Sequence, residues 1–160
     1  MGYVYVSVGS NVDREKNVKS ALQALRDRFG ELEQSRVYRT EAVGFEGEPF
    51  YNLVVGFETG LSPRDLVAAL HDIEEQHGRK REQPSFSNRT LDLDLLLYDE
   101  LVLEEPGLVL PRPELLEYAF VLGPLAEIAG ERKHPVLGHS FQSLWDVFDP
   151  TAQPMWPVEL

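Results

Sequence analysis

The sequence predicts an α+β fold whose strands and helices follow the order β-α-β-β-α-β. Residues 3–8 and 89–98 alternate with the period-two pattern of strands. Residues 14–29 and 63–77 repeat apolar residues every three to four positions, as amphipathic helices do. The 160 residues, 42% of them hydrophobic, are enough to bury one core, so we expect a single domain over 1–160.

The first half of the pattern is a strand, a helix and a second strand. Gly9-Ser10-Asn11 ends the first strand, and the helix 14–29 carries one apolar stripe before Gly30 stops it. A strand follows over 33–39. Two Gly and one Pro then make 40–49 a long loop.

The second half opens with a Val- and Phe-rich strand over 52–59. Ser62 is placed to cap the next helix, Pro63 fits its first turn, and the helix runs to His77. The polar, basic segment 79–88 reads as a loop, and loops of this length in compact domains are more often functional than idle.

The segment 89–98 is the fourth strand. Its alternation predicts one buried face, made of Leu91, Leu93, Leu95 and Leu97. The opposite face would carry Asp92, Asp94, Leu96 and Tyr98. Since both faces hold apolar residues, we expect this strand and the strand 3–8 to be the central pair of the sheet. The order predicts a ferredoxin-like antiparallel sheet with both helices on one face.

The remaining residues should decorate this core. Residues 101–103 are expected to form a short hairpin with the fourth strand, after a tight turn at 99–100. Short C-terminal helices are expected at 114–121, 124–129 and 141–148. Three prolines predict that 149–160 is an extended, loosely held tail.

Composition and charge narrow the classes of function. The net charge of −12 argues against a nucleic-acid partner, and zero Cys removes disulfides and thiolate chemistry. No apolar run approaches the 18 residues or so of a membrane span, and the N-terminal residues do not read as a targeting segment. We therefore expect a cytoplasmic protein that acts on small molecules as a monomer.

Two features point to phosphate chemistry. Asp92 and Asp94 would stand side by side on one strand face, and paired carboxylates are suited to Mg²⁺ shared with substrate phosphates. Arg79, Arg81 and Arg89 lie just before them and are suited to bind phosphate. The same residues also fit two solvent-facing strand positions and an ordinary solvated loop, so the pattern alone leaves both readings open.

The run Arg89 to Tyr98 resembles the signature of the 6-hydroxymethyl-7,8-dihydropterin pyrophosphokinase family of folate biosynthesis. Further motifs agree in the same order over about residues 4–148: Val8–Asn11, Ser35–Thr40, Phe50–Asn52, Ile73–Arg79 and Pro124–Ala129. The resemblance implies an ATP-dependent pyrophosphokinase, a transferase that moves pyrophosphate from ATP to the hydroxymethyl oxygen of the pterin and releases AMP.

The resemblance also implies roles for residues. Asp92 and Asp94 would bind two Mg²⁺ ions together with ATP, and Arg79 and Arg89 would be catalytic, holding phosphates and stabilising the transferring group. ATP would be bound by Glu74, Arg79, Arg81, Arg89 and Arg112. The pterin would be bound by Thr40, Val43, Phe50, Asn52 and Phe120.

The chain departs from the family pattern after Pro111. Arg112 stands where the family usually has His, Pro113 replaces an aromatic residue, and Tyr118 replaces a helix Arg. The loop has Phe86 in place of the usual Trp. A second reading is therefore a catalytically weakened or non-catalytic module that binds a nucleotide or a pterin on the same fold.

Overall fold

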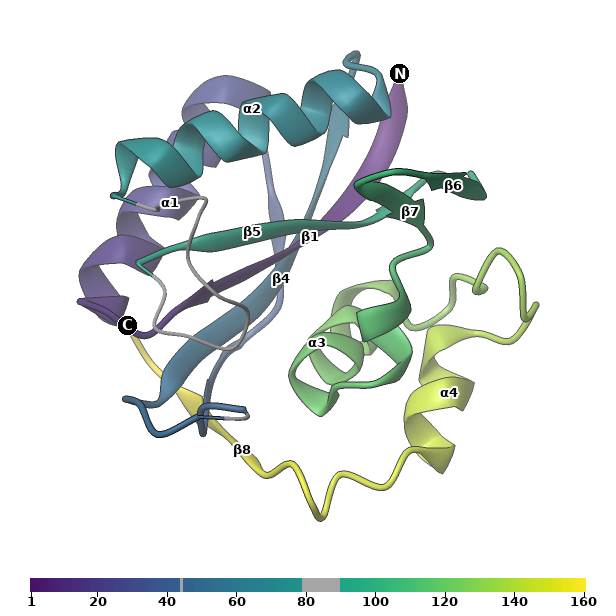
Figure 1. The fold of residues 1–160 in the computed structure, drawn as a ribbon. Coiled ribbons are helices and arrows are strands. Elements are labelled where there is room, and N and C mark those ends of the chain that lie inside the picture. Colours follow the sequence, from purple (N-terminus) through teal and green to yellow (C-terminus); the bar gives the residue numbers. More distant parts are fainter. Residues whose placement is uncertain (44, 79–89) are drawn as a thin grey trace.

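The computed structural model describes residues 1–43, 45–78 and 90–160 and consists of a sheet with helices on both faces (Figure 1). The order β-α-β-β-α-β is confirmed as the core of a mixed α/β fold. Its elements are β1 (Gly2–Ser10), α1 (Arg14–Phe29), β2 (Glu33–Gln34), β3 (Val37–Thr40), β4 (Phe50–Thr59), α2 (Pro63–Gln76), β5 (Asp92–Tyr98), β6 (Leu103–Glu105), β7 (Leu108–Leu110), the 3-10 turn η1 (Pro113–Leu116), α3 (Ala119–Ala129), α4 (Phe141–Val147) and β8 (Met155–Val158).

The expected single strand 33–39 is two short strands, β2 and β3. The break falls at Ser35, whose hydroxyl oxygen accepts the N–H of Val54 at 3.0 Å, while its own N–H donates to the Val54 carbonyl. A side chain thus takes the place of one ladder acceptor, and the chain leaves regular strand geometry for two residues.

The large sheet has the strand order β5-β1-β4-β3-β8, and all of its described pairs are antiparallel. The expectation that the strand 89–98 is central is wrong, because β5 stands at the end of this order and β1 and β4 are central. Apolar residues on both faces of a strand do not require a strand on each side. Here they reflect helices that cover both faces of the sheet (Figure 1).

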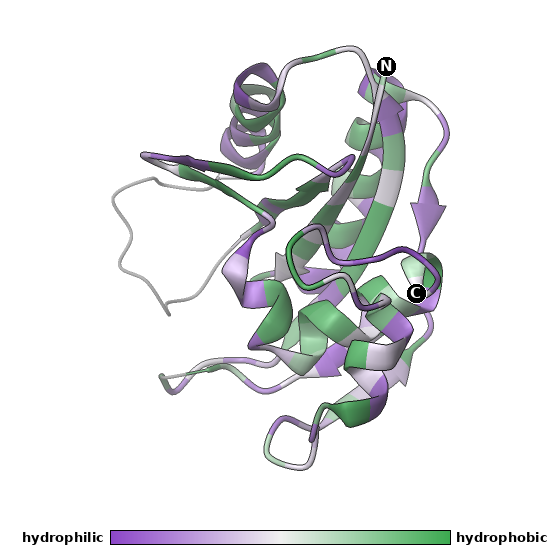
Figure 2. Ribbon diagram, turned by 90° about the vertical axis from the view of Figure 1, so that its right-hand side faces the viewer, coloured by the Kyte–Doolittle hydropathy of each residue, from purple (hydrophilic) through white to green (hydrophobic). Residues whose placement is uncertain are grey.

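The first face of the sheet is covered by α1 and α2, which confirms that both helices lie on one side (Figure 1). Their apolar stripes pack on β1, β4 and β5. The strands of the large sheet are largely hydrophobic (Figure 2). The buried helix residues of this layer are Val18, Ala21, Leu22, Leu25, Leu66, Leu70 and Ile73. Burying such side chains contributes roughly 1.5–3 kcal/mol each for Val, Leu and Ile, so this layer is the main apolar core.

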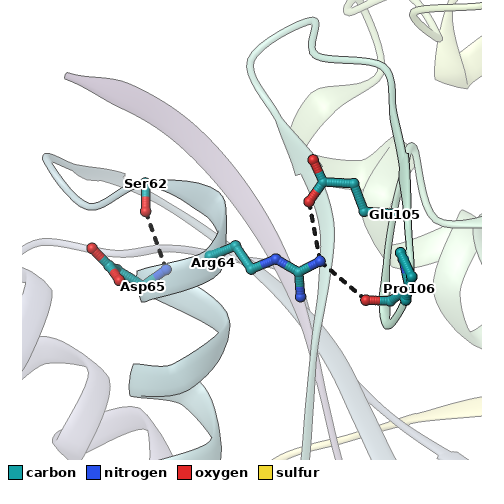
Figure 3. A network of polar contacts seen from close by, with 5 residues as sticks. All are labelled: Ser62, Arg64, Asp65, Glu105 and Pro106. Carbon is teal, nitrogen blue, oxygen red and sulfur yellow. Dashed lines mark hydrogen bonds and ion pairs between the residues drawn. The ribbon is translucent and has the colours of Figure 1, made fainter.

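The start of α2 is as the sequence predicts. The Ser62 side chain accepts the Asp65 N–H at 3.2 Å (Figure 3). Pro63 occupies the first turn. The side chain of the next residue, Arg64, donates hydrogen bonds to the Glu105 carboxylate and the Pro106 carbonyl of the β6–β7 hairpin.

That hairpin differs from the prediction. The strand β6 begins at Leu103 and pairs with β7 around Gly107, whose φ is 76°. Residues 101–102 are outside any strand and do not pair with β5. A turn at 99–100 is present, with Asp99 at φ 49°, but the chain then runs on to form a separate two-stranded sheet.

The second face is covered by α3, with α4 packed on α3 (Figure 1). The turn η1 adds the buried Leu115 to this layer. The expected separate helices at 114–121 and 124–129 are instead the turn η1 and the continuous helix α3, which contains Pro124. The helix expected at 141–148 is confirmed as α4. In the described parts of the chain, no helix has both the length and the apolar character needed to cross a membrane.

The alternation of β5 changes phase near its end. Tyr5 of β1 faces Leu97 and Val6 faces Leu95, so Leu96 is an extra residue, a β-bulge. Leu97 therefore packs in the second core with Leu96, and Tyr98 packs against the first. The expected placement of Leu97 with the other odd-numbered Leu is wrong for this reason.

The tail 149–160 contains the strand β8 (Figure 1), which pairs with β3 and is itself an edge strand of the large sheet. Val37 faces Val158 and Thr40 faces Met155. The Arg39 guanidinium lies 5.0 Å from the centroid of the Trp156 ring. The tail is extended only over β8, because the chain turns at 150–153, where the Gln153 N–H donates to the Pro150 carbonyl at 2.9 Å. The expectation that the tail is loosely held is wrong, since β8 is paired with β3.

Candidate active site

A cavity of about 540 Å³ lies on the second face of the sheet, between the strands and the start of α3. This volume is within the usual range of roughly 300–1,000 Å³ for small-molecule sites. Its walls come from β1, β4, β5, the loop after β3, and the segment from Arg112 to Val121. The predicted site residues that line it are Thr40, Val43, Phe50, Asn52, Asp92, Asp94, Arg112 and Phe120.

The two carboxylates enter this cavity from β5. Asp92 faces Gly9 of β1 and Asp94 faces Ser7, and all four residues line the cavity. The period-two geometry that buries Leu93 on the other face places both carboxylates on this one. Gly9 leaves room for the Asn52 side chain, because a Cβ on residue 9 would lie only 2.7 Å from Asn52 Oδ1.

Arg112 is held beside this pair. Its backbone N–H donates to the carbonyl of Leu96, the bulge residue of β5, at 3.0 Å. Its guanidinium Nε lies 2.6 Å from Glu114 Oε2, and Nη2 lies 3.6 Å from Asp94 Oδ1. The side chains of Asp94 and Arg112 are 41% and 37% exposed, so this cation stands at the open side of the carboxylates.

Asn52 and Thr40 form a buried polar pair at the other end of the cavity. The Asn52 amide donates to Thr40 Oγ1 at 2.7 Å, and the two residues are 8% and 4% exposed. The pairing of β3 with β4 brings them together, since Thr40 faces Phe50 and Tyr38 faces Asn52. A buried amide in a cavity wall offers fixed donors and acceptors to the edge of a polar ring.

Aromatic residues form two other walls. Phe50 meets Phe45 edge to face, with ring centroids 6.5 Å apart. Phe120 stacks on Tyr118, with centroids 5.1 Å apart and the planes at 20°. Flat heterocycles bind well in such surroundings. The sequence singled out Phe50 and Phe120, treated Tyr118 only as a departure from the family, and missed Phe45.

Phe45 lies in the Gly- and Pro-containing loop, where no periodic pattern tells a ligand contact from a surface residue. The sequence reading also missed three acidic residues that line the cavity, which are Glu41, Glu114 and Glu117. Of these, Glu114 could have been suspected, because it follows the unusual Arg112 by two residues.

Glu74 does not line the cavity formed by the described residues. It is 5% exposed, and its Oε2 accepts the N–H of Leu93 at 2.8 Å. Leu93 lies between the two carboxylates in sequence, so α2 holds the β5 backbone at the point that positions them. A contact of Glu74 with a nucleotide stays a prediction. Arg79, Arg81 and Arg89 lie outside the described residues.

The described donor set fits Mg²⁺ in one particular way. Over 1–43, 45–78 and 90–160, no group of three or more His, Cys, Asp or Glu is placed to hold a metal ion. Asp92 and Asp94 provide hard oxygen ligands that face a cavity, and Mg²⁺ commonly takes one or two carboxylates together with substrate phosphates and waters. The two residues therefore fit a metal that is shared with a phosphate ligand.

Comparison with known proteins places this site in context. The model of the family described as 7,8-dihydro-6-hydroxymethylpterin-pyrophosphokinase matches residues 5–130. The chain is 38% identical over 128 residues to the 2-amino-4-hydroxy-6-hydroxymethyldihydropteridine pyrophosphokinase of Bacillus subtilis, covering 78% of this chain and 76% of that protein. It is 37% identical over 135 residues to the protein of the same name from Porphyromonas gingivalis, covering 81% and 92%.

Longer proteins also match. The chain is 34% identical over 158 residues to the folic acid synthesis protein fol1 of Pneumocystis carinii, covering 96% of this chain but 21% of that protein. Among solved structures, wild-type HPPK-DHPS of Plasmodium falciparum superposes with a TM-score of 0.70 at 15% identity, covering 91% of this chain and 43% of that one. At this identity the likeness shows the fold alone.

Proposed function

The chain belongs to the 7,8-dihydro-6-hydroxymethylpterin-pyrophosphokinase family, the pyrophosphokinases of folate biosynthesis, and we propose that it transfers pyrophosphate from ATP to 6-hydroxymethyl-7,8-dihydropterin, releasing AMP. The single observation that carries the proposal is the position of Asp92 and Asp94. They lie side by side in a cavity that also offers aromatic walls and a buried amide. Phosphoryl transfer depends mainly on such positioning and on charge stabilisation.

In the proposed reaction the hydroxymethyl oxygen of the pterin attacks the β-phosphorus of ATP. A new O–P bond forms to that phosphorus, the bond from it to the bridging oxygen of the α-phosphate breaks, AMP leaves with that oxygen, and the hydroxyl proton is released to water. Asp92 and Asp94 would hold two Mg²⁺ ions against the triphosphate. When bound, the metal neutralises phosphate charge and keeps the attacking and leaving oxygens in line.

The pterin ring would lie between Phe50 and Phe120, with its polar edge toward Asn52 and the backbone near Thr40 and Val43. The hydrogen bond from Asn52 to Thr40 fixes the amide orientation before the ring arrives. Because the Asn52–Thr40 pair is already buried and oriented, a ring with matching donors and acceptors binds at little free-energy cost for ordering the pair. A ring without such groups leaves buried polar atoms unpaired, which weakens its binding.

Arg112 would contact the phosphates in place of the family His. Its guanidinium is held by Glu114 and already stands beside Asp94. A guanidinium can bind phosphate oxygens through two N–H groups at once, which an imidazole cannot do. The proposal for Arg79, Arg81 and Arg89 as phosphate ligands, with Arg79 and Arg89 catalytic, rests on the sequence motif.

We further propose a cytoplasmic monomer on a ferredoxin-like scaffold that is extended by β8. The net charge of −12 supports a small-molecule partner over nucleic acid. The second candidate function is a module that binds nucleotide or pterin without turnover. It is favoured by one observation, that Asp94 and Glu114 both contact the unusual Arg112.

The deciding experiment measures AMP formation from ATP and Mg²⁺, with and without 6-hydroxymethyl-7,8-dihydropterin. We expect AMP that depends on the pterin and disappears when EDTA removes the metal. Pterin binding by calorimetry without AMP formation would support the non-catalytic module instead. A fully active Asp92→Ala/Asp94→Ala double variant would contradict the metal role of the two carboxylates.

A further inference from the structure

The C-terminal tail contacts the aromatic wall of the cavity through Gln153. The Gln153 Oε1 accepts the backbone N–H of Ala119 at 2.8 Å, and its Nε2 donates to the carbonyl of Glu117 at 3.0 Å. Both bonds are to the backbone on either side of Tyr118. Residues 131–160 lie beyond the segment matched by the family model, so this contact comes from outside the matched region.

The two hydrogen bonds are made at the N-terminal end of α3. The first N–H groups of a helix have no partner within the helix and need one from elsewhere. Tyr118 is the N-cap of α3, and its side chain makes no capping hydrogen bond in the described structure. Gln153 therefore caps α3 from 34 residues away. The helix turn that it caps carries Phe120, and Tyr118 and Phe120 both line the main cavity.

The same tail also holds the opposite wall. Met155 faces Thr40 in the β3–β8 pair, and Thr40 accepts the hydrogen bond of Asn52. Met155 in addition packs on α3, since a Cβ on Gly123 would lie 2.6 Å from its Cε.

A second cavity of about 290 Å³ lies where the tail meets these two walls. It is lined by 152–154 from the tail and, on its other side, by Tyr118, Phe120 and 40–43. The tail thus stands behind both the Thr40 end and the Phe120 end of the main cavity.

We propose that Gln153 is a positioning residue for the pterin side of the site. It fixes the backbone at Glu117 and Ala119, and it thereby fixes the distance and angle of the Tyr118–Phe120 stack relative to Phe50 and Asn52. This inference rests on the proposed function, because it assigns the ring between Phe50 and Phe120 to the pterin. It predicts that the tail affects pterin binding and leaves ATP binding alone.

The test compares Gln153→Ala with the wild-type chain in steady-state AMP formation. Losing two neutral hydrogen bonds should raise the pterin KM about tenfold while the ATP KM stays within about twofold. Gln153→Glu keeps the acceptor for Ala119 but puts a carboxylate oxygen against the Glu117 carbonyl in place of the donor, so its pterin KM should rise at least as far as that of Gln153→Ala. Gln23→Ala is the matched control, because it removes an exposed Gln side chain from α1 on the other face of the sheet.

A second measurement does not depend on turnover. Hydrogen exchange followed by mass spectrometry should show faster exchange over 117–121 in Gln153→Ala, with α1 and α2 unchanged. A merely structural role would lower the melting temperature and raise both KM values together, and that outcome would overturn the inference.

The failure of this inference is distinguishable from that of the proposed function. An active wild-type chain whose Gln153→Ala variant has an unchanged pterin KM would overturn the positioning role and leave the pyrophosphokinase proposal standing. A wild-type chain without pterin-dependent AMP would contradict the proposed function, and the positioning role with it.

Discussion

The two faces of the large sheet carry opposite kinds of chemistry, and β5 contributes to both. Toward α1 and α2 it presents Leu93 and Leu95, each 3% exposed. Toward α3 it presents Asp92 and Asp94 at a cavity before the strand turns apolar at Leu96. One face is a continuous apolar layer, whereas the other is interrupted by a polar hollow.

This difference suggests that the two faces of β5 have separate roles, one in stability and one in binding. The apolar layer removes side chains from water and stabilises the fold. The hollow keeps two like charges close together, which is unfavourable unless cations lie beside them, as the Arg112 guanidinium lies beside Asp94. Glu74 connects the two, because from the α2 side it accepts the N–H of Leu93, between the carboxylates. Substitutions on the two faces should therefore separate activity from stability.

The largest effect is expected on the polar face. Asp92→Asn and Asp94→Asn keep the shape of each side chain and remove its charge, so metal-dependent turnover should fall at least about 1,000-fold, or roughly 4 kcal/mol. The free energy of unfolding should change by less than about 1 kcal/mol, because both side chains are partly exposed. Pterin-dependent AMP release checks the turnover, and urea unfolding of the same samples checks the free energy of unfolding.

The control for these variants is Asp27→Asn, which removes an exposed carboxylate from α1. It should leave turnover unchanged. Turnover within tenfold of wild type in either Asp92→Asn or Asp94→Asn would contradict the idea that the polar face carries the chemistry.

The next effect is expected on the apolar face and has the opposite signature. Leu25 of α1 is fully buried in the first core. Truncation by Leu25→Ala should lower the free energy of unfolding by about 2–5 kcal/mol, through lost burial and the cavity left behind. Activity per folded molecule should stay within about twofold. A large drop in kcat with unchanged stability would show that the two faces are not separable in this way.

The parts of this division that the sequence predicted follow from local periodicity. The period of two in β5 placed Asp92 and Asp94 on one face, and the apolar stripes of α1 and α2 marked the sides of these helices that are buried. Side-chain direction within one element is a local property of the backbone, so a single sequence contains it. The Ser62 cap of α2 was predictable for the same reason.

The parts that were missed depend on which elements become neighbours. The bulge at Leu96 reflects hydrogen bonding between β1 and β5 and reverses the direction of Leu97. The ion pairs of Arg112 require that its backbone be fixed to that bulge residue. The hold of Gln153 on α3 spans 34 residues. The periodicity of a sequence does not show contacts of this kind. The tail was therefore predicted to be loosely held.

A smaller effect should appear at alkaline pH on the cavity side. Tyr38 of β3 donates to Glu127 of α3 at 2.6 Å, and burial, together with this carboxylate, raises the pKa of Tyr38 to about 12 from its ordinary 10. The folded chain then holds a proton that the unfolded chain releases between these values. The stabilisation is complete below pH 10 and is lost as the pH rises to 12.

Because Tyr38 is partly exposed, we expect this alkaline loss to amount to only about 1 kcal/mol. Tyr38→Phe should lose part of that stability at neutral pH and show a shallower decline between pH 10 and 12, measured by urea unfolding at each pH. An equally steep decline in Tyr38→Phe would assign the alkaline transition to other groups, such as Tyr3, whose pKa is also raised by burial.

The smallest effect is expected where the apolar layer meets solvent. Arg64 Nη2 lies 3.0 Å from Glu105 Oε1 and 3.1 Å from the Pro106 carbonyl, which joins α2 to the β6–β7 hairpin (Figure 3). The two charged side chains are 55% and 48% exposed, and such pairs contribute about 0–1 kcal/mol. Arg64→Ala should therefore lower the free energy of unfolding by less than about 1 kcal/mol, and by less still in high salt. Thermal unfolding at two salt concentrations checks this, and a loss as large as that of Leu25→Ala would mean that polar contacts, and not the apolar layer, hold α2 on the sheet.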